Sequence, residues 1–257
     1  MYSEERKLKI IDFITNYSRA SVQDLSDYLK VSQSTIRRDL KELQTTNQIQ
    51  RTHGGAVSLQ AVNFEPKIMD KEVEYVQEKK AIAKKAVEFI DDGDTILLDA
   101  GTTTLPILED LQQFSQLTIV TNSILIMRNF KPTAGIEILF LGGSLRNETL
   151  ASVGSFAEHN LEMIRVDKAF VAINGVHLTE GLTTPNLIEA RIKKLMIQNA
   201  QQVILLSDSS KMGKVSFAKV ADLQEIDKFI VDDRLHPSFK KSLEELGVEV
   251  ISVQTRP

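Results

Sequence analysis

The sequence predicts an α/β protein in two parts, a winged helix-turn-helix module over residues 1–58 and a larger, mostly parallel α/β domain over residues 76–257. Two patterns predict this division. The first part shows three short helical periods separated by turns, and the second alternates short apolar runs with helical ones. Charge divides in the same way. The first 58 residues hold nine Lys and Arg against seven Asp and Glu, and the remainder holds 22 against 28. A locally basic segment joined to an acidic body is typical of a DNA-contacting module attached to a domain with another task.

The composition excludes several kinds of chemistry. The 257 residues include no cysteine, which rules out disulfides, cysteine-ligated zinc, iron–sulfur clusters and a cysteine nucleophile. The four histidines are scattered without metal-ligand spacing, so we expect no metal site. The sequence has neither a Walker loop nor a GxGxxG fingerprint, and we expect no cofactor. The charged N-terminus has no apolar signal core, and no run approaches 18 apolar residues. We therefore expect a soluble cytoplasmic protein with no membrane partner.

The first module begins with three helices. Apolar residues recur at helical spacing over residues 4–17. Ser21, with Asp24 three residues on, forms an approximate capping box that opens a second helix over residues 22–29. A tight turn separates it from a third helix over residues 33–46, whose apolar positions follow i, i+4 and i+7. Three short helices with a short turn between the last two predict a helix-turn-helix.

The third helix is the expected recognition helix, because the start of the last helix in this motif enters the DNA major groove. Arginine and glutamine read base edges there, and hydroxyls and lysine suit phosphate contacts. The alternative is that these side chains are only solvated residues on a helix surface and contact no DNA. The helical residues that we expect to contact DNA are Gln33, Ser34, Thr35, Arg37, Arg38 and Lys41.

A two-stranded wing is expected after the third helix. Residues 49–53 alternate in polarity, Gly54-Gly55 follows, and Asn47 suits the preceding turn because asparagine tolerates positive φ. Arg51 and His53 are placed to reach phosphate or the minor groove. A metal-ligand role for His53 is the poorer interpretation, because no second ligand lies nearby in the sequence.

These residues resemble the DNA-binding head of the DeoR family of bacterial transcriptional repressors. The matching motifs are SVQDLSDYLKVSQSTIRRDLKEL, beginning at Ser21, and RTHGGA, beginning at Arg51. Asn47 departs from the family, which usually has glycine there. The resemblance implies that the partner of this module is operator DNA.

Residues 59–75 show mixed polarity and no clean period, so we expect a linker. Beyond them, continuous apolar strands alternate with helices, which predicts a sheet covered on both faces. Strands are expected near residues 95–100, 117–122, 136–143, 168–174, 202–207, 228–233 and 248–253.

Small donor residues follow four of these strands, and two of the groups also include a cation. The carboxyl ends of parallel strands meet at one edge of the sheet, where ligands bind. Glycine and hydroxyl residues at such positions offer N–H and O–H donors to an anion, so convergence predicts a phosphate or sugar-phosphate site. The residues concerned are Gly101, Thr102, Thr103 and Thr104; Thr121, Asn122 and Ser123; Gly142, Gly143 and Arg146; and Asp208 with Lys211.

The second part resembles the C-terminal sensor domain of the DeoR family, which is similar in fold to ribose-5-phosphate isomerase. The motifs DAGTTT, VTNS, LGGSLR, INGV, GLTT, NLIEA and SDSSK stand here in the family's order. The resemblance implies a transcription factor whose sensor binds a phosphorylated sugar, and it adds Asp99, Asn174 and Glu189 to the expected effector site. Glu189 either hydrogen-bonds sugar hydroxyls or is a helix residue beside Arg191.

An enzyme of the isomerase type is the rival interpretation. By resemblance, Glu189 occupies the position of the catalytic base, but Asn174 and His177 replace paired aspartates and Glu180 replaces a lysine. Asparagine cannot carry the charge of aspartate, and glutamate reverses that of lysine. We therefore expect no enzyme.

The full prediction is a repressor of a carbohydrate operon, released from its operator by a phosphorylated sugar. We expect a homodimer or homotetramer, because operator symmetry mirrors protein symmetry. The sequence leaves the identity of the sugar open, and it does not exclude an activator with the same two domains.

Overall fold

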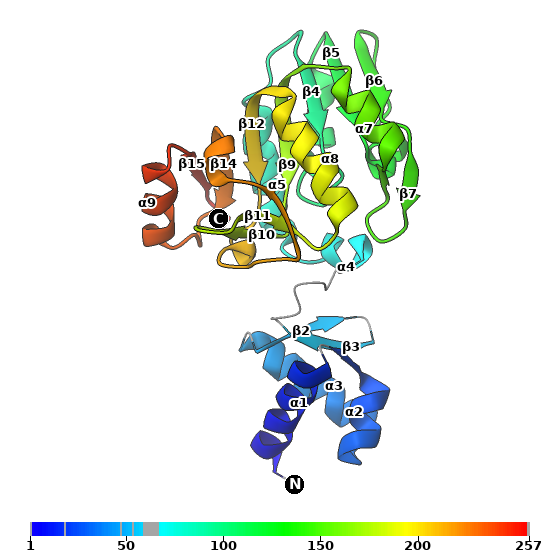
Figure 1. The fold of residues 1–257 in the computed structure, drawn as a ribbon, viewed down its shortest axis with the longest axis vertical. Helices are drawn as coiled ribbons and strands as arrows, with labels where there is room; N and C mark the ends of the chain where they lie inside the picture. The colour runs from blue at the N-terminus through cyan, green and yellow to red at the C-terminus, as the bar shows by residue number, and fades with distance from the viewer. Residues whose placement is uncertain (1, 18, 47, 53, 59–66, 256–257) are drawn as a thin grey trace. The chain divides into compact units, whose positions relative to one another are not determined.

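The computed structural model describes residues 2–17, 19–46, 48–52, 54–58 and 67–255. The chain divides into two compact units, Met1–Pro66 and Lys67–Pro257 (Figure 1). Asn47, His53 and residues 59–66 lie outside the described residues, and so the turn at Asn47, the role of His53 and most of the expected linker stay predictions. No helix within the described ranges has the length and hydropathy of a membrane span.

The N-terminal unit packs three helices against a small antiparallel sheet of order β1-β3-β2. Buried side chains from all three helices and from the sheet form its core. The three predicted helices are confirmed, and the third is followed by the two strands of the wing. The elements are α1 (Ser3–Tyr17), β1 (Arg19–Ser21), α2 (Val22–Leu29), α3 (Gln33–Thr45), β2 (Ile49–Thr52) and β3 (Gly55–Ser58).

Local caps set the ends of these helices. Ser21 Oγ accepts from Asp24 N at 3.0 Å and Ser21 N donates to Asp24 Oδ2 at 2.9 Å, which is the predicted capping box.

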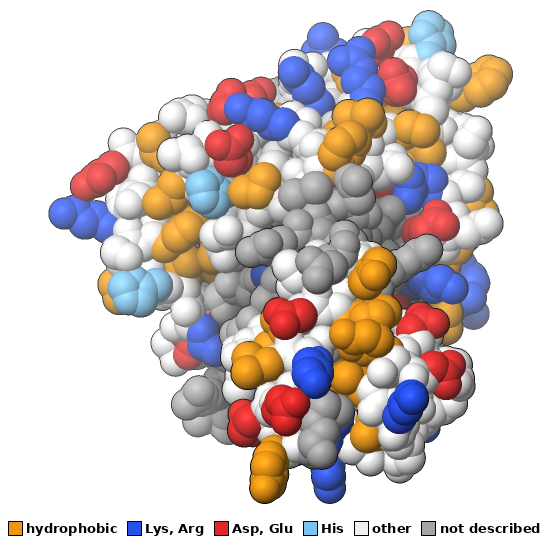
Figure 2. Space-filling model, turned by 60° about the horizontal axis from the view of Figure 1, so that its bottom comes forward, with side chains coloured by type: hydrophobic (Ala, Val, Ile, Leu, Met, Phe, Trp, Pro, Cys, Tyr) orange, Lys and Arg blue, Asp and Glu red, His pale blue; other side chains and the backbone are white. Residues whose placement is uncertain are grey.

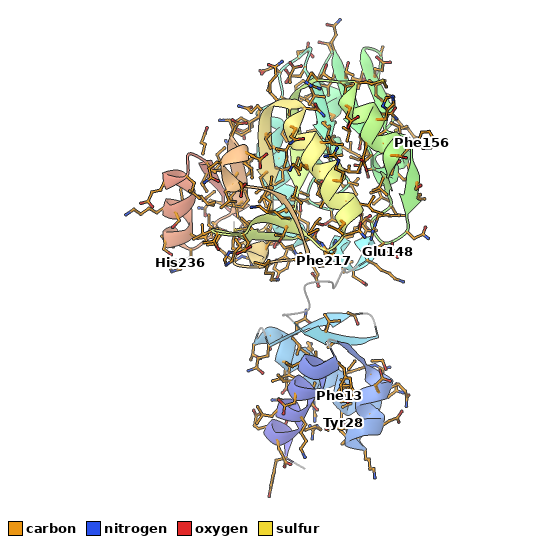
Figure 3. All side chains as sticks on the ribbon, in the orientation of Figure 1. Phe13, Tyr28, Glu148, Phe156, Phe217 and His236 are labelled. Carbon is orange, nitrogen blue, oxygen red and sulfur yellow. The ribbon has the colours of Figure 1, made fainter. Side chains whose placement is uncertain are left out.

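The Phe13 and Tyr28 rings, 4.8 Å apart between centroids, join α1 to α2 (Figure 3). Strand β1 was not predicted, because three residues are too few to show alternation. It pairs with β3 at Gly55, where a Cβ atom would stand 2.0 Å from the Ala20 carbonyl oxygen.

The C-terminal unit is built on a seven-stranded parallel sheet of order β15-β14-β12-β9-β4-β5-β6. Its strands are β4 (Thr95–Leu98), β5 (Leu117–Thr121), β6 (Ile136–Phe140), β9 (Val166–Ala172), β12 (Ala200–Leu206), β14 (Lys228–Asp232) and β15 (Glu249–Val253). The α-helices are α4 (Ile68–Glu72), α5 (Val76–Val87), α6 (Ile124–Asn129), α7 (Ser155–Glu162), α8 (Leu187–Gln198) and α9 (Pro237–Glu245). All seven predicted strands are confirmed.

Helices cover both faces of this sheet. Alternate residues of each strand point to opposite sides, so each strand contributes apolar side chains to both helical layers. Leu97 of β4 packs into one apolar cluster with residues of α7, α8 and α9. Its neighbours Ile96 and Leu98 pack into a second cluster with residues of α5 and α6. Figure 1 shows α8 in front of the sheet and α5 behind it. Two separate apolar clusters therefore hold the sheet between two helical layers.

The order of the strands reverses at one point. From β4 the chain builds outward through β5 and β6, whereas β9, β12, β14 and β15 build outward on the other side. Strands β4 and β9 are thus neighbours whose following loops turn in opposite directions. Such a switch point opens a crevice at the carboxyl ends of the two strands, and ligands bind there in sheets of this kind.

Several elements differ from the sequence prediction. The C-terminal unit begins at Lys67, because the expected linker contains helix α4, which is too short to show a period. Between β4 and β5, where the alternation predicts a helix, the chain forms two 3₁₀ segments, Leu105–Glu109 and Leu111–Gln113, and the first has a proline in its first turn. A hairpin and a small antiparallel sheet were not predicted. These are β7 (Ser144–Arg146) with β8 (Ala151–Val153), and β10 (Gly175–His177), β11 (Gly181–Thr184) and β13 (Ala218–Ala221).

Candidate functional site

The N-terminal end of α3 presents a polar surface. Ser32 caps the helix, its Oγ accepting from Thr35 N at 3.3 Å. The predicted residues Ser34, Arg37, Arg38 and Lys41 are exposed, while Gln33 and Thr35 are half-buried. The opposite face of α3 is packed into the core of the unit. The structure therefore places these six residues along one solvent-facing helix, as insertion into a groove requires.

Gln33 links this surface to α2. Its Nε2 donates to Gln23 Oε1 at 2.5 Å, and its Oε1 accepts from Arg37 Nη2 at 3.1 Å. The guanidinium of Arg37 is thereby held over the first turn of α3. The sequence prediction did not include Gln23. A polar residue in the first turn of the preceding helix carries no local signal that it faces α3.

A buried ion pair fixes α3 from behind. Arg6 of α1 donates from Nε to Asp39 Oδ2 at 2.5 Å and from Nη2 to Asp39 Oδ1 at 2.9 Å. The hydrogen bond to Asp39 raises the pKa of Arg6, against the effect of burial. Asp39 lies three residues after Ile36 on the apolar side of the helix. A charged residue on a buried stripe is the sequence signal for such a pair.

Arg51 of the wing is half-buried on β2. Figure 2 shows positive and negative side chains interspersed on the visible face, without a patch of a single sign.

The C-terminal unit contains an open cavity at the carboxyl ends of β4 and β9. Its empty space, part of it open to solvent, is about 510 Å³. The cavity lies at the switch point of the sheet. Its lining residues are Lys71, Glu74, Lys79, Ala100, Gly101, Thr102, Thr103, Thr149, Ala172, Ile173, Asn174, Glu189, Lys193, Asp208 and Lys211. Of the predicted effector residues, the structure brings together Gly101, Thr102, Thr103, Asn174, Glu189 and Lys211.

The loop after β4 forms one wall of the cavity and is held by its own hydrogen bonds. Asp99 is buried; its Oδ2 accepts from Ala172 N at 3.0 Å and from the Lys193 ammonium. Burial raises the pKa of Asp99, and the lysine opposes that shift. Thr104 Oγ1 donates to the carbonyl oxygens of Asp99 at 2.7 Å and Gly101 at 2.9 Å, so its hydroxyl is used within the loop. Asp99 and Thr104 therefore shape the wall from behind.

Gly101 is required by close packing. A Cβ atom at this position would stand 2.7 Å from the Ala172 Cβ on β9. The backbone of the loop thus lies against the neighbouring strand, and Gly101 borders the cavity without a side chain.

Glu189 stands in the first turn of α8, which Asn186 caps. Its carboxylate accepts from Thr149 Oγ1 and forms an ion pair with Arg146 Nε at 3.1 Å. Only 6% of the residue is exposed. Arg191 pairs instead with Glu158 at 3.5 Å. The Glu189 carboxylate is therefore held in a fixed orientation in the cavity wall. Arg146 does not line the cavity itself but helps to orient this carboxylate.

Lys79 and Lys211 are two of the four lysines that line the cavity. Lys79 of α5 is 5% exposed, and burial lowers its pKa to about 8, although Asp208 acts in the opposite direction. Lys211 lies in the short 3₁₀ segment Ser209–Lys211 after β12. The prediction missed Lys79, as it missed Lys193 and Thr149. Lys193 follows Glu189 by four residues and so shares its helix face, which is the signal that could have found it.

Three predicted residues support the cavity from outside it. Thr121 Oγ1 donates to Leu98 O at 2.7 Å, and Asn122 Oδ1 accepts from Ala100 N at 2.9 Å. Ser123 Oγ caps α6. The polar atoms of Thr121 and Asn122 are thus engaged with the backbone of β4 and of the cavity loop, whereas that of Ser123 is engaged with α6.

Four further positions lie apart from the cavity lining. The turn Gly142-Gly143 precedes β7, and a Cβ on Gly143 would stand 2.5 Å from Val153 O. His177 and Glu180 belong to the β10–β11 hairpin, where the His177 Nδ1 accepts from Glu180 N at 3.3 Å. Within the described ranges, no group of three or more histidines and carboxylates is arranged to hold a metal ion.

The arrangement can hold a ligand with two chemical ends. Backbone N–H groups, threonine hydroxyls and the ammonium groups of Lys79 and Lys211 suit an anion. Glu189 and Asn174 offer acceptors that suit hydroxyl groups, and the Asn174 Oδ1 already accepts from Thr184 Oγ1 at 3.0 Å.

Comparison with known proteins agrees with the two units. Residues 6–62 match the model of the DeoR-like helix-turn-helix domain, and residues 74–233 match that of the DeoR C terminal sensor domain. The HTH-type transcriptional regulator GlpR of Haloferax volcanii is 39% identical over 251 residues, covering 98% of each chain. The lactose phosphotransferase system repressor of Staphylococcus epidermidis is 34% identical, covering 98% of this chain and all of that one.

Among solved structures, the ribose 5-phosphate isomerase A of Methanocaldococcus jannaschii is 21% identical over 52% of this chain and 53% of its own. The TM-score is 0.36, a level that supports no inference about function.

Proposed function

The chain belongs to the DeoR family of transcriptional regulators, and from this premise we propose that it represses a carbohydrate-utilisation operon and leaves its operator when a phosphorylated sugar binds the cavity at β4 and β9. It is a DNA-binding regulator and not an enzyme, because both of its domains and its curated relatives are those of transcriptional regulators. What we propose is the class of the effector, the genes that the chain controls and its release from DNA by the effector.

One observation carries the proposal: the cavity lining combines ammonium, N–H and O–H donors, which suit the anionic end of a ligand, with acceptors that suit its hydroxyl end. Lys79 and Lys211 line it together with the Gly101–Thr103 loop, and Glu189 lines it from the N-terminus of α8. A phosphoryl group accepts charge-assisted hydrogen bonds from ammonium groups and from N–H and O–H donors. Sugar hydroxyls donate well to a carboxylate. A phosphorylated sugar satisfies both ends at once, which a free sugar or inorganic phosphate does not.

The names of relatives support the same ligand class. One relative is called a lactose phosphotransferase system repressor and another an aga operon transcriptional repressor. An effector that is the phosphorylated form of the sugar taken up would couple the operon to its substrate. We extend the proposal to a cytoplasmic homodimer or homotetramer, because a helix-turn-helix protein reads two half-sites by its own two-fold symmetry.

Fluorescence polarisation with a labelled DNA fragment from upstream of the chain's own operon tests the proposal. Binding is measured at two salt concentrations, since affinity for DNA depends strongly on salt. Glucose 6-phosphate, fructose 1-phosphate and galactose 6-phosphate are each compared with the free sugar. We expect one phosphorylated sugar to release the DNA and its free counterpart to have no effect. Release by free sugars alone, or specific binding that no phosphorylated sugar weakens, would contradict the proposed effector.

A further inference from the structure

Helix α4 is the first element of the C-terminal unit and follows directly on the segment that joins it to the DNA-binding unit. With five residues it is too short to be stable alone and depends on its contacts. Ile68 N donates to Glu148 O at 2.8 Å, and Lys79 Nζ donates to the Lys71 carbonyl oxygen in the last turn of the helix. The Ile68 side chain is buried. These two hydrogen bonds and the buried Ile68 side chain are among the contacts that hold α4 in place.

Both hydrogen bonds lead to the cavity. Lys79 lines it directly. Glu148 lies at the tip of the β7–β8 hairpin (Figure 3), next to Thr149, which donates to Glu189 in the cavity wall. Lys71 and Glu74 also line the cavity. A ligand in the cavity therefore meets α4 itself and the groups that hold it.

Two residues with unusual backbone conformations flank these contacts. Leu150 has a φ of 51° immediately after Thr149, and Tyr75 has a φ of 52° immediately after Glu74. A side chain other than glycine is strained in this left-handed region and stays there only when its surroundings fix it. Such positions are found at ligand clamps and switch segments, and here both adjoin residues that line the cavity.

We propose that α4 senses occupancy of the cavity: a bound phosphoryl group draws the Lys79 ammonium away from the Lys71 carbonyl, and the release of α4 is what the DNA-binding unit reads. The inference rests on the proposed function and specifies how effector binding is coupled to release of the operator. Its physical basis is competition, because an oxygen of a dianionic phosphoryl group is a stronger acceptor for an ammonium group than a neutral carbonyl oxygen. The held arrangement of α4 is the one that binds DNA. A ligand shifts the balance by preferring the other arrangement.

A probe on α4 tests the movement. The chain has no cysteine, so Met69→Cys, at a position 72% exposed on α4, takes a single environment-sensitive fluorophore. Met163→Cys, at a position 66% exposed just beyond α7, is the matched control. Inorganic phosphate is titrated against sodium chloride of equal ionic strength. We expect phosphate to change the emission of the Met69→Cys label and to leave that at Met163→Cys unaltered. No change at Met69→Cys at any phosphate concentration, or an equal change at both labels, would overturn the inference.

A second test needs no ligand. Ile68→Pro removes the N–H that donates to Glu148 O, at a first helical position that accepts proline, and Lys67 already has the extended backbone that precedes proline. Ile68→Ala removes the same buried side chain but keeps the N–H. We expect Ile68→Pro to bind the operator fragment at least tenfold more weakly than Ile68→Ala, at similar melting temperatures.

By reciprocity, Ile68→Pro should also bind phosphate more tightly than Ile68→Ala. Equal operator affinities of the two variants would overturn the inference. If the wild-type chain is released by a phosphorylated sugar and the two variants still behave alike, only the role of α4 fails. If no phosphorylated sugar releases the wild-type chain, the proposed function fails whatever α4 does.

Discussion

Arg6 and Asp39 form a buried ion pair with two hydrogen bonds, joining the first turn of α1 to the middle of α3. Asp39 is fully buried. The position of α3 relative to α1 therefore depends on charge as well as on apolar packing. When one partner of such a pair is removed, the other is left as an uncompensated buried charge.

Asp39→Ala should consequently destabilise the N-terminal unit by about 3–5 kcal/mol. Urea unfolding measures this, together with operator binding, which should fall because α3 loses its support. Glu42→Ala is the control, since it removes an ion pair with Lys7 in which Glu42 is exposed, and such pairs contribute about 0–1 kcal/mol. Equal effects of the two variants would show that the buried pair has no special weight.

Arg37→Ala and Arg38→Ala should each weaken specific operator binding by about 1–3 kcal/mol if that arginine reads a base. Competition between operator and random DNA separates this from a phosphate contact, which would weaken both alike. Lys9→Ala, on the exposed side of α1, serves as the comparison. Unchanged affinity in both arginine variants would remove α3 from the DNA interface.

Lys211→Ala should abolish release by the phosphorylated sugar, because it removes a positive charge from the lining of the cavity. Operator affinity without the sugar should stay near that of the wild type. Polarisation assays with and without the sugar measure both quantities. Lys240→Ala, on the exposed side of α9, keeps the net charge equal to that of the variant. A normal response of Lys211→Ala would place the effector elsewhere.

Binding of the phosphorylated sugar should weaken as the pH rises above about 8. Burial lowers the pKa of Lys79 to about 8, with Asp208 and Glu74 raising it and Lys211 lowering it. The lysine is charged below that value and loses its proton above it, while a phosphoryl group, with a second pKa of about 6, stays doubly charged. Affinity should fall by up to about tenfold per pH unit between pH 8 and pH 9. Calorimetric titration should show that fall in the wild type, whereas Lys79→Gln should give a flat profile.

Local signals in the sequence predicted much of the fold. The capping box at Ser21 and the period of α3 are complete within a few residues, and the parallel strands are continuous apolar runs. The elements that the sequence did not predict are those stabilised by contacts with residues far away in the sequence. Strand β1 exists because β3 lies beside it, and α4 because Glu148 and Lys79 hold it. No pattern within such short segments indicates these partners.

The same difference separates the predicted cavity residues from the missed ones. Gly101, Thr102 and Thr103 were predicted because the ends of parallel strands meet at one edge. Lys79 was missed because a lysine in an amphipathic helix is normally solvated. Asn122 lies in a predicted position, but its side chain bonds the backbone of the cavity loop, and the direction of a side chain is fixed only by tertiary packing.

The contact between Gly101 and Ala172 also bears on how such a regulator changes its effector during evolution. There is no room for a side chain at position 101, so this part of the cavity loop tolerates little substitution. Lys71 of α4 and Thr149 at the tip of the β7–β8 hairpin line the same cavity, and each already carries a side chain there. Under the proposed function, a lineage would acquire a new sugar through substitutions at lining positions of this second kind, while position 101 is inherited unchanged.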